Sequence, residues 1–265
     1  MKLWYQSLSR HDAANPYRMA LEKLLRDSAD PGTAVQVHSI VEAAGIADDY
    51  RAMEFLNTRE VVMNSVRAER DGCDAFLIGN MTDGGLRESR ELVNIPVLGL
   101  AETCYHLACV MGANFGLITV NDKYTPRMVE NLQRYGLERR MSTIVRLRSD
   151  PQALKLAFAD PLRKSTLLAQ FDEAARAAGA NGAEVLIPCG GVLMALLASE
   201  GIYEVERMPV INGVIELVKF AEMAVKMRAL TGRFTSKRLV YAPPHGETLA
   251  RIRDFHGPDM YPGAT

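Results

Sequence analysis

Short apolar runs alternate with longer amphipathic stretches along most of the chain. The short runs predict strands, and the stretches whose apolar positions recur every three or four residues predict helices. This alternation is typical of βαβ units, in which a parallel sheet carries helices on both faces. The predicted strands cover residues 3–8, 34–41, 74–79, 95–100, 115–120, 142–149, 184–189 and 208–212. The predicted helices cover residues 13–27, 50–70, 102–112, 127–137, 163–179 and 213–232.

The chain also contains a short internal repeat. GCDAFLI at 72–78 resembles GAEVLI at 182–187, and IPV at 95–97 is matched by MPV at 208–210. The two offsets, 110 and 113 residues, nearly agree, so we expect two pseudo-symmetric Rossmann-like α/β lobes with the active site in the cleft between them. The first lobe is assigned to 1–112 plus 213–235, the second to 113–212, and a C-terminal extension to 236–265.

Composition and charge narrow the class of protein. The 265 residues are 48% hydrophobic and carry 31 Lys plus Arg against 32 Asp plus Glu. A formal charge of −1 argues against a nucleic-acid or anionic-membrane binder, and no apolar stretch is long enough to cross a bilayer. The N-terminal residues lack a signal-peptide core, and the four cysteines form no metal-ligand cluster. We therefore expect a cytoplasmic enzyme or small-ligand binder without a metal or cofactor, and a homo-oligomer.

Two loops could hold the chemistry, because ligands of open parallel sheets bind beyond the carboxyl ends of the strands. The loops are residues 79–86 and 188–192, and both are rich in small residues that let backbone N–H groups approach an anion. They offer five substrate-binding candidates: Met81, Thr82, Asp83, Gly190 and Gly191. Among the cysteines, Cys189 lies at a strand-to-helix turn, where the helix N-terminus can lower a thiol pKa. The other three cysteines are predicted to be packing residues.

These segments resemble a known family. GCDAFLIGNMTDGGLRESRELVNIPVLGLAET is similar to the first signature of the aspartate/glutamate and hydantoin racemase superfamily, and GAEVLIPCGG with MPVINGVIELVKFAE is similar to the second. The resemblance implies two lobes and a cofactor-independent active site. It also implies two thiols on opposite sides of a small carboxylate or cyclic amide substrate, exchanging the proton beside its carbonyl.

The chain departs from the family pattern at the thiols. Asn80 occupies the position of the first one, and an amide cannot act as a base. Which residue occupies the position of the second thiol is not fixed by the spacing, because Asp74 precedes Asn80 by six residues but Glu184 precedes Cys189 by five. Either Cys189 reaches the cleft through a shorter turn, or Gly190 lies opposite Asn80. The CGG loop itself resembles that of the arylmalonate decarboxylases, which keep only the second thiol.

The N-terminal strand differs as well. Gln6 and Ser7 fall where family members carry an Asn-Pro-Asn-like turn, and both could bind a polar end of the substrate. In the second lobe, Thr119 and Tyr124 flank the loop that follows a predicted strand and are further substrate-binding candidates.

The leading hypothesis is a racemase-like isomerase that acts at the carbon beside a carboxylate or an amide or imide carbonyl. Cys189 would be the acid/base or nucleophile, and Asn80, Thr82 and Gly190 would stabilise the oxyanion. A single thiol disfavours racemisation by two opposed bases. A decarboxylase or lyase, or an isomerase or hydrolase with a cysteine nucleophile, is therefore the alternative. The competing hypothesis from another functional class is a non-catalytic protein that binds small acids.

Overall fold

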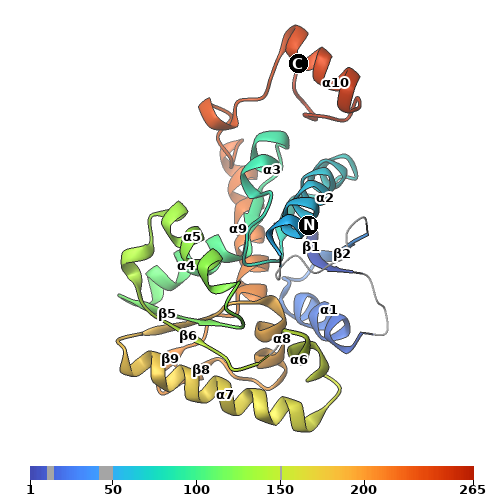
Figure 1. Ribbon diagram of the computed structural model, residues 1–265. Coiled ribbons are helices and arrows are strands. Elements are labelled where there is room, and N and C mark those ends of the chain that lie inside the picture. Colours follow the sequence, from blue (N-terminus) through green and yellow to red (C-terminus); the bar gives the residue numbers. More distant parts are fainter. Residues whose placement is uncertain (11–14, 42–49, 150) are drawn as a thin grey trace.

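Two parallel sheets form the framework of the computed structural model, which describes residues 1–10, 15–41, 50–149 and 151–265 (Figure 1). The first sheet has the order β2-β1-β3-β4 and the second the order β6-β5-β7. The strands are β1 (Lys2–Arg10), β2 (Ala34–Ile40), β3 (Ala75–Ile78), β4 (Val97–Gly99), β5 (Phe115–Thr119), β6 (Met141–Arg146) and β7 (Val185–Pro188). All pairs within these two sheets are parallel, so the predicted two-lobed α/β architecture is confirmed.

Helices follow the strands, as the hydrophobic spacing predicted, although residues 13 and 14 of the first predicted helix lie outside the described residues. They are α1 (Pro16–Ser28), α2 (Arg51–Arg70), α3 (Leu86–Leu92), α4 (Leu100–Met111), α5 (Thr125–Tyr135), α6 (Pro151–Leu156), α7 (Pro161–Ala180), α8 (Gly191–Ser199), α9 (Gly213–Thr231) and α10 (Gly246–His256). Individual residues determine where some of these helices begin. Asn15 and Asp160 cap α1 and α7 through their side chains, and each is followed by a proline at the first helical position.

The strand predicted at 208–212 is much shorter than expected. Only β9 (Met208–Pro209) forms, and it pairs antiparallel with β8 (Glu204–Val205). Beside the second sheet, Val210 makes a single parallel bridge to β7. Pro209 has no N–H to give to a ladder, and the turn at residues 206 and 207, both with positive φ, folds the segment back on β8.

One apolar core runs through both lobes. Leu3 and Tyr5 of β1 belong to the same buried cluster as Leu117 of β5 and Ile187 of β7. The alternate residues of β1 point to the other face of the first sheet, where Trp4 joins a second cluster under α2 and α3. Because the lobes share a core, the loops at their strand ends are held in fixed relation to each other.

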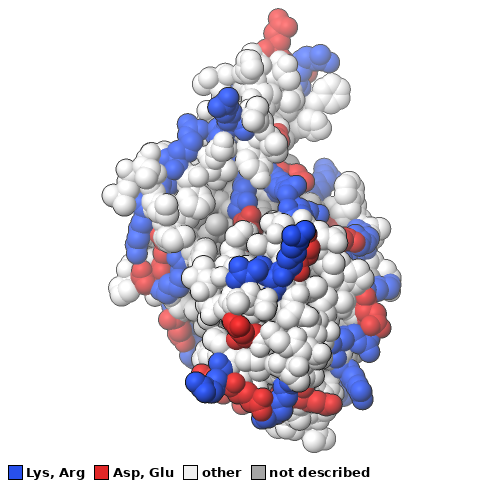
Figure 2. Space-filling view, turned by 90° about the vertical axis from the view of Figure 1, so that its left-hand side faces the viewer, with Lys and Arg blue, Asp and Glu red and all other residues white. Residues whose placement is uncertain are grey.

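Charge is interspersed over the surface. On the face in Figure 2, Lys and Arg side chains lie among Asp and Glu side chains and form no single broad field. Among the described residues, no helix combines the length and apolarity that crossing a bilayer requires.

The C-terminal segment, residues 236–265, projects away from the sheets (Figure 1) and is fastened by a lysine. The Lys237 ammonium donates to the carbonyls of Arg90, Glu91 and Val93 at 2.6–2.8 Å, where α3 ends. A cation at this end also complements the helix dipole. Tyr261 donates a further hydrogen bond to the Glu91 carboxylate, at 2.6 Å.

Replacing Lys237 with methionine is expected to loosen this segment. The three carbonyls lose a charged donor, and we expect the free energy of opening residues 236–265 to fall by about 1–2 kcal/mol. Hydrogen exchange across α10 measures the change. Lys226→Met is the matched control, because Lys226 makes an exposed ion pair with Asp30 and such pairs contribute little. Equal exchange in the two variants would contradict the anchoring role.

Candidate active site between the two lobes

The ends of β3 and β7 are equivalent positions in the two sheets. Leu3 of β1 pairs with Ala75, and Phe115 of β5 pairs with Val185 in the same register. Four residues further along, a backbone N–H again donates to the central strand in each lobe, at 2.9 Å in the first and 2.8 Å in the second. The donors are Gly79 and Cys189, which are therefore counterparts.

It follows that Asn80 and Gly190, the next residues, are counterparts too. The hydrogen-bond register thus supports the alternative in which Gly190 takes the place opposite Asn80. Cys189 ends the strand one residue earlier.

The Cys189 side chain lies in the shared core. It is fully buried, and its Sγ is 3.5 Å from the carbonyl oxygen of Ile187. Burial raises the pKa of this thiol strongly. A thiol in such surroundings stays protonated and unreactive, so the geometry argues against the predicted nucleophile or base at Cys189.

The two loops meet at glycines. A Cβ placed on Gly191 would lie 3.8 Å from the Gly79 carbonyl oxygen, so the start of α8 comes within van der Waals distance of the end of β3. A Cβ placed on Gly190 would meet nothing within 4 Å, which leaves open space beside that residue. The first N–H groups of α8 have no acceptor within the helix and carry the positive end of its dipole. This junction is thus suited to an anionic oxygen.

Tyr5 brings an unpartnered hydroxyl to the same junction. A Cβ on Gly79 would lie 2.3 Å from the Tyr5 ring and hydroxyl, so only glycine lets the ring pack there. The Tyr5 oxygen is also 3.9 Å from the Cβ position of Gly191. The side chain is fully buried, its hydroxyl has no hydrogen-bond partner among the described residues, and burial raises its pKa well above the usual value. Tyr5 is therefore a neutral donor with nothing to donate to.

The rest of the first loop is ordered by its own side chains. The Asn80 Oδ1 accepts from the N–H of Thr82 at 2.8 Å, which leaves the amide NH₂ as the donating end of Asn80. The Met81 side chain is buried in the shared core. The Thr82 hydroxyl is buried and has no hydrogen-bond partner in the part of the chain that the structure describes. Thr82 is thus the residue of this loop whose hydroxyl is available to a ligand.

Asp83 fastens the loop to the rest of the molecule. Its carboxylate accepts from the N–H groups of Ala101 and Glu102, at 3.0 and 2.8 Å, and from the Tyr135 hydroxyl at 2.6 Å. Burial raises the pKa of Asp83 to about 6. These contacts tie the loop to the first turn of α4 and to the last residue of α5, so Asp83 acts here as a structural cap.

The predicted contributors from β1 are engaged elsewhere. Gln6 points to the side of the sheet opposite Tyr5, where its Oε1 accepts from Trp4 at 3.1 Å and from Asn64 of α2 at 2.9 Å. The Ser7 hydroxyl accepts from the N–H of Ser9 at 3.2 Å. The alternation of β1 thus presents Tyr5 to the loop junction in place of Gln6.

The second-lobe candidates lie near the start of α5. Thr119 is fully buried, and its hydroxyl shares a 2.7 Å hydrogen bond with that of Thr125. Tyr124 is buried beside it, with its N–H donating to Asn121 at 2.6 Å. In the described chain, no group of three or more His, Cys, Asp or Glu side chains gathers as a metal site.

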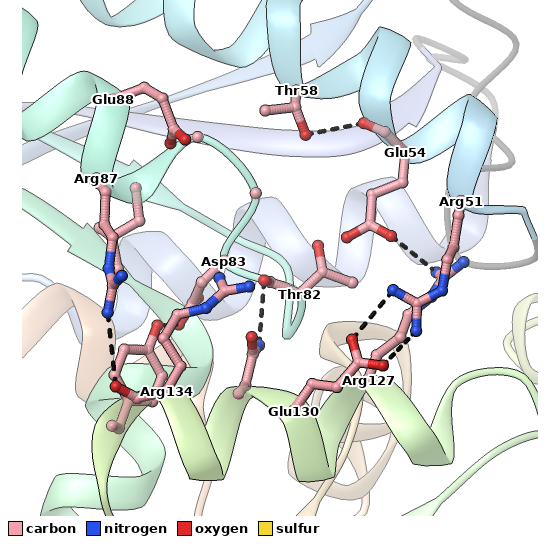
Figure 3. Close-up of a pocket in the computed structure, with 15 residues that line it drawn as sticks. Arg51, Glu54, Thr58, Thr82, Asp83, Arg87, Glu88, Arg127, Glu130 and Arg134 are labelled. Atoms are coloured by element: carbon pink, nitrogen blue, oxygen red, sulfur yellow. Dashed lines mark hydrogen bonds and ion pairs between the residues drawn. The ribbon is translucent and has the colours of Figure 1, made fainter.

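A polar cavity of about 370 Å³ adjoins the first loop (Figure 3). Its walls come from α2 and α3 of the first lobe and from α5 of the second. The lining residues are Arg51, Glu54, Thr58, Thr82, Asp83, Gly84, Gly85, Leu86, Arg87, Glu88, Arg127, Glu130, Asn131, Arg134 and Tyr135. Sequence reasoning missed this cavity. A signal was present in α5, where Arg127, Asn131 and Arg134 recur at helical spacing on one face.

The chain is similar to known proteins in sequence and in fold. The model of the family "Asp/Glu/Hydantoin racemase" matches residues 16–221. A hydantoin racemase from Pseudomonas sp. (strain NS671) is 32% identical over 204 residues, which are 76% of this chain and 77% of that protein. A hydantoin racemase from Rhizobium meliloti is 31% identical over 69% of this chain and 72% of its own length.

Solved structures share the fold. An allantoin racemase from Pseudomonas fluorescens superposes with a TM-score of 0.74 at 23% identity, covering 93% of this chain and 98% of its own. An arylmalonate decarboxylase superposes with a TM-score of 0.53 at 13% identity, covering 85% of this chain and 92% of its own. At these identities the likeness concerns the fold alone.

Proposed function

The chain belongs to the Asp/Glu/hydantoin racemase family, a family of isomerases, and we propose that it acts without a cofactor on the carbon beside a carbonyl of a small cyclic amide or carboxylate. The observation that supports this most directly is the convergence of donors where the two loops meet. They are the Tyr5 hydroxyl and the first N–H groups of α8, which lie beside the loop that begins at Asn80. Thr82, in the same loop as Asn80, adds a buried hydroxyl.

Such donors suit carbanion chemistry. When a carbon beside a carbonyl loses a proton or a carboxyl group, negative charge develops on the carbonyl oxygen. Fixed hydrogen-bond donors in a site without bulk water stabilise that charge far more than they do in water. In our proposal the substrate carbonyl occupies the junction and accepts from Tyr5 and from the first N–H groups of α8.

The proton carrier must differ from that of the family pattern. Asn80 stands where the resemblance implies the first thiol, and the hydrogen-bond register supports Gly190 over Cys189 for the place opposite it. Neither Asn80 nor Gly190 can hold a proton for exchange. The open space beside Gly190 leaves room for a water molecule, and we assign proton transfer to that water. Decarboxylation is the second candidate, because departure of carbon dioxide generates the carbanion with no base at all.

Solvent deuterium exchange tests the proposal. The protein is incubated in D₂O with 5-substituted hydantoins and, separately, with an arylmalonate, and the carbon beside the carbonyl is followed by NMR. Exchange of the hydantoin proton supports isomerase chemistry, and carbon dioxide release supports decarboxylation. Tight binding of these compounds with neither reaction would contradict both and leave a non-catalytic binder.

Cys189→Ala is expected to keep turnover within about twofold of the wild type, because its buried thiol does not face the junction. Loss of the buried sulfur should lower the free energy of unfolding by about 1–2 kcal/mol. Turnover and urea denaturation are measured together, with Cys104→Ala as the control at an equally buried thiol. A hundredfold loss of turnover in folded Cys189→Ala alone would restore the single-thiol mechanism.

A cytoplasmic location and self-association complete the proposal. They rest on the composition and on the family, and size-exclusion chromatography with light scattering tests the second.

A further inference from the structure

Four arginines and four carboxylates line the cavity beside the first loop, and they are not all paired with one another. Two of its four arginines are neutralised. Arg51 donates twice to the Glu130 carboxylate, at 3.0 and 2.5 Å, and the nearly buried Arg127 lies 3.3 Å from the Glu54 carboxylate. These pairs close one end of the cavity, between α2 and α5.

The other two arginines face the cavity from opposite lobes. Arg87 lies in the first turn of α3, and Arg134 lies in the last turn of α5. Within the described part of the chain, neither side chain forms an ion pair. The one hydrogen bond of Arg87 goes to the backbone carbonyl of Arg134, at 3.5 Å. Glu130, one helical turn from Arg134, is already held by Arg51. Figure 3 shows the Arg134 side chain rising from α5 toward the loop at Thr82. Glu130 lies within electrostatic reach of Arg134, but neither Arg87 nor Arg134 forms an ion pair with a carboxylate of the described residues.

Buried hydroxyls lie between these walls. The Thr82 hydroxyl has no partner, although the residue is only 4% exposed. A Cβ added at Gly84 would lie 2.7 Å from the Thr58 hydroxyl and 3.6 Å from that of Thr82, so the two hydroxyls flank one small space. Asn131 donates to the Thr82 carbonyl at 3.1 Å and holds the loop in place from α5.

We propose that this cavity binds the oxyanion group of a small molecule, a carboxylate or a phosphate, between Arg87 of the first lobe and Arg134 of the second, with the Thr82 hydroxyl as a third donor. Guanidinium groups present paired N–H donors that match both kinds of oxyanion. A volume of about 370 Å³ is of the size that small ligands occupy. Because its walls belong to different lobes, the bound anion would bridge them.

The anion has two possible sources. It could be a substituent of the substrate, since the loop that carries Thr82 begins at Asn80, or it could belong to a separate ligand. The chemistry that recognises it is the same in both cases, and the cavity does not depend on the proposed reaction.

Binding of inorganic phosphate and of succinate, by calorimetry at constant ionic strength, tests the site. We expect millimolar or tighter binding of at least one of them, weakened at least tenfold in Arg134→Gln and in Arg87→Gln. Arg251→Gln, on the exposed helix α10, is the control and should bind as the wild type does. The melting temperature without ligand checks that each variant is folded. Absence of binding in the wild type, or equal affinity in all four proteins, overturns the proposal.

Inhibition kinetics then identify the source. Competition between the probe and a substrate that turns over places the anion on the substrate, and inhibition or activation without competition places it on a separate ligand. Because calorimetry needs no turnover, failure of this site and failure of the proposed function are separate results.

Discussion

Asp83→Ala is expected to lower the free energy of unfolding by about 4 kcal/mol near pH 5, the largest stability change that we predict. Two backbone N–H groups at the start of α4 and the Tyr135 hydroxyl lose their shared acceptor, and each buried donor left unpaired costs about 1–3 kcal/mol. The melting temperature should fall by about 8–15 °C for a chain of this size. Urea denaturation monitored by circular dichroism measures the change. Glu130→Ala, at an exposed ion pair, should change stability by less than about 1 kcal/mol.

The effect of Asp83→Ala should also depend on pH. Burial raises the pKa of Asp83 to about 6 from an ordinary value of 3.8, so the folded protein holds the proton more tightly than the unfolded chain. The stability that Asp83 contributes is therefore greatest below its unfolded pKa and falls as the pH rises through 6. The difference between variant and wild type should shrink by about 2 kcal/mol from pH 4 to pH 7. A difference that grows with pH would contradict this assignment.

Tyr5→Phe is expected to lower kcat/KM by about 100-fold, the usual magnitude for removal of one oxyanion donor. The hydroxyl is the only group that the substitution removes. Because the hydroxyl has no partner in the folded protein, its loss should leave the free energy of unfolding unchanged or raise it by about 1 kcal/mol. Turnover of the substrate found by deuterium exchange is compared with thermal unfolding of the same preparation.

Tyr105→Phe is the matched control for Tyr5. Tyr105 is also fully buried, but its hydroxyl already donates a hydrogen bond to the Met128 sulfur, at 3.6 Å. We expect turnover to be retained in Tyr105→Phe. A Tyr5→Phe variant that is less stable and as active as the wild type would show that the phenol is a packing group.

The architecture could be predicted from the sequence because its signals are local. Apolar runs of four to six residues predict β3, β5 and β7. The internal repeat at an offset of 110 residues agrees with the hydrogen-bond register, in which Gly79 and Cys189 are counterparts. The prediction of a strand at 208–212 was wrong because Pro209 and the turn before it prevent the sheet hydrogen bonds there, and an apolar pattern alone does not reveal this.

The site was less accessible to sequence reasoning, because it depends on single positions. The spacing left Cys189 and Gly190 as alternatives, and only the register of β7 against β5 separates them. Gln6 and Tyr5 are neighbours in the chain, yet the pleat sends them to opposite faces of the sheet. The arginine cavity joins α3 to α5 across the two lobes, a proximity that no local pattern contains.

The pairing of Asn80 with Gly190 has a stereochemical consequence. Two lobes with the same group at both positions would treat a planar intermediate alike from above and below. Here one lobe offers a carboxamide and the other a bare backbone next to open space, so the pseudo-twofold relation is broken where the intermediate would lie. In the decarboxylation alternative, a proton delivered at this junction would therefore arrive preferentially from one side, and the difference between these two residues would set the handedness of the product.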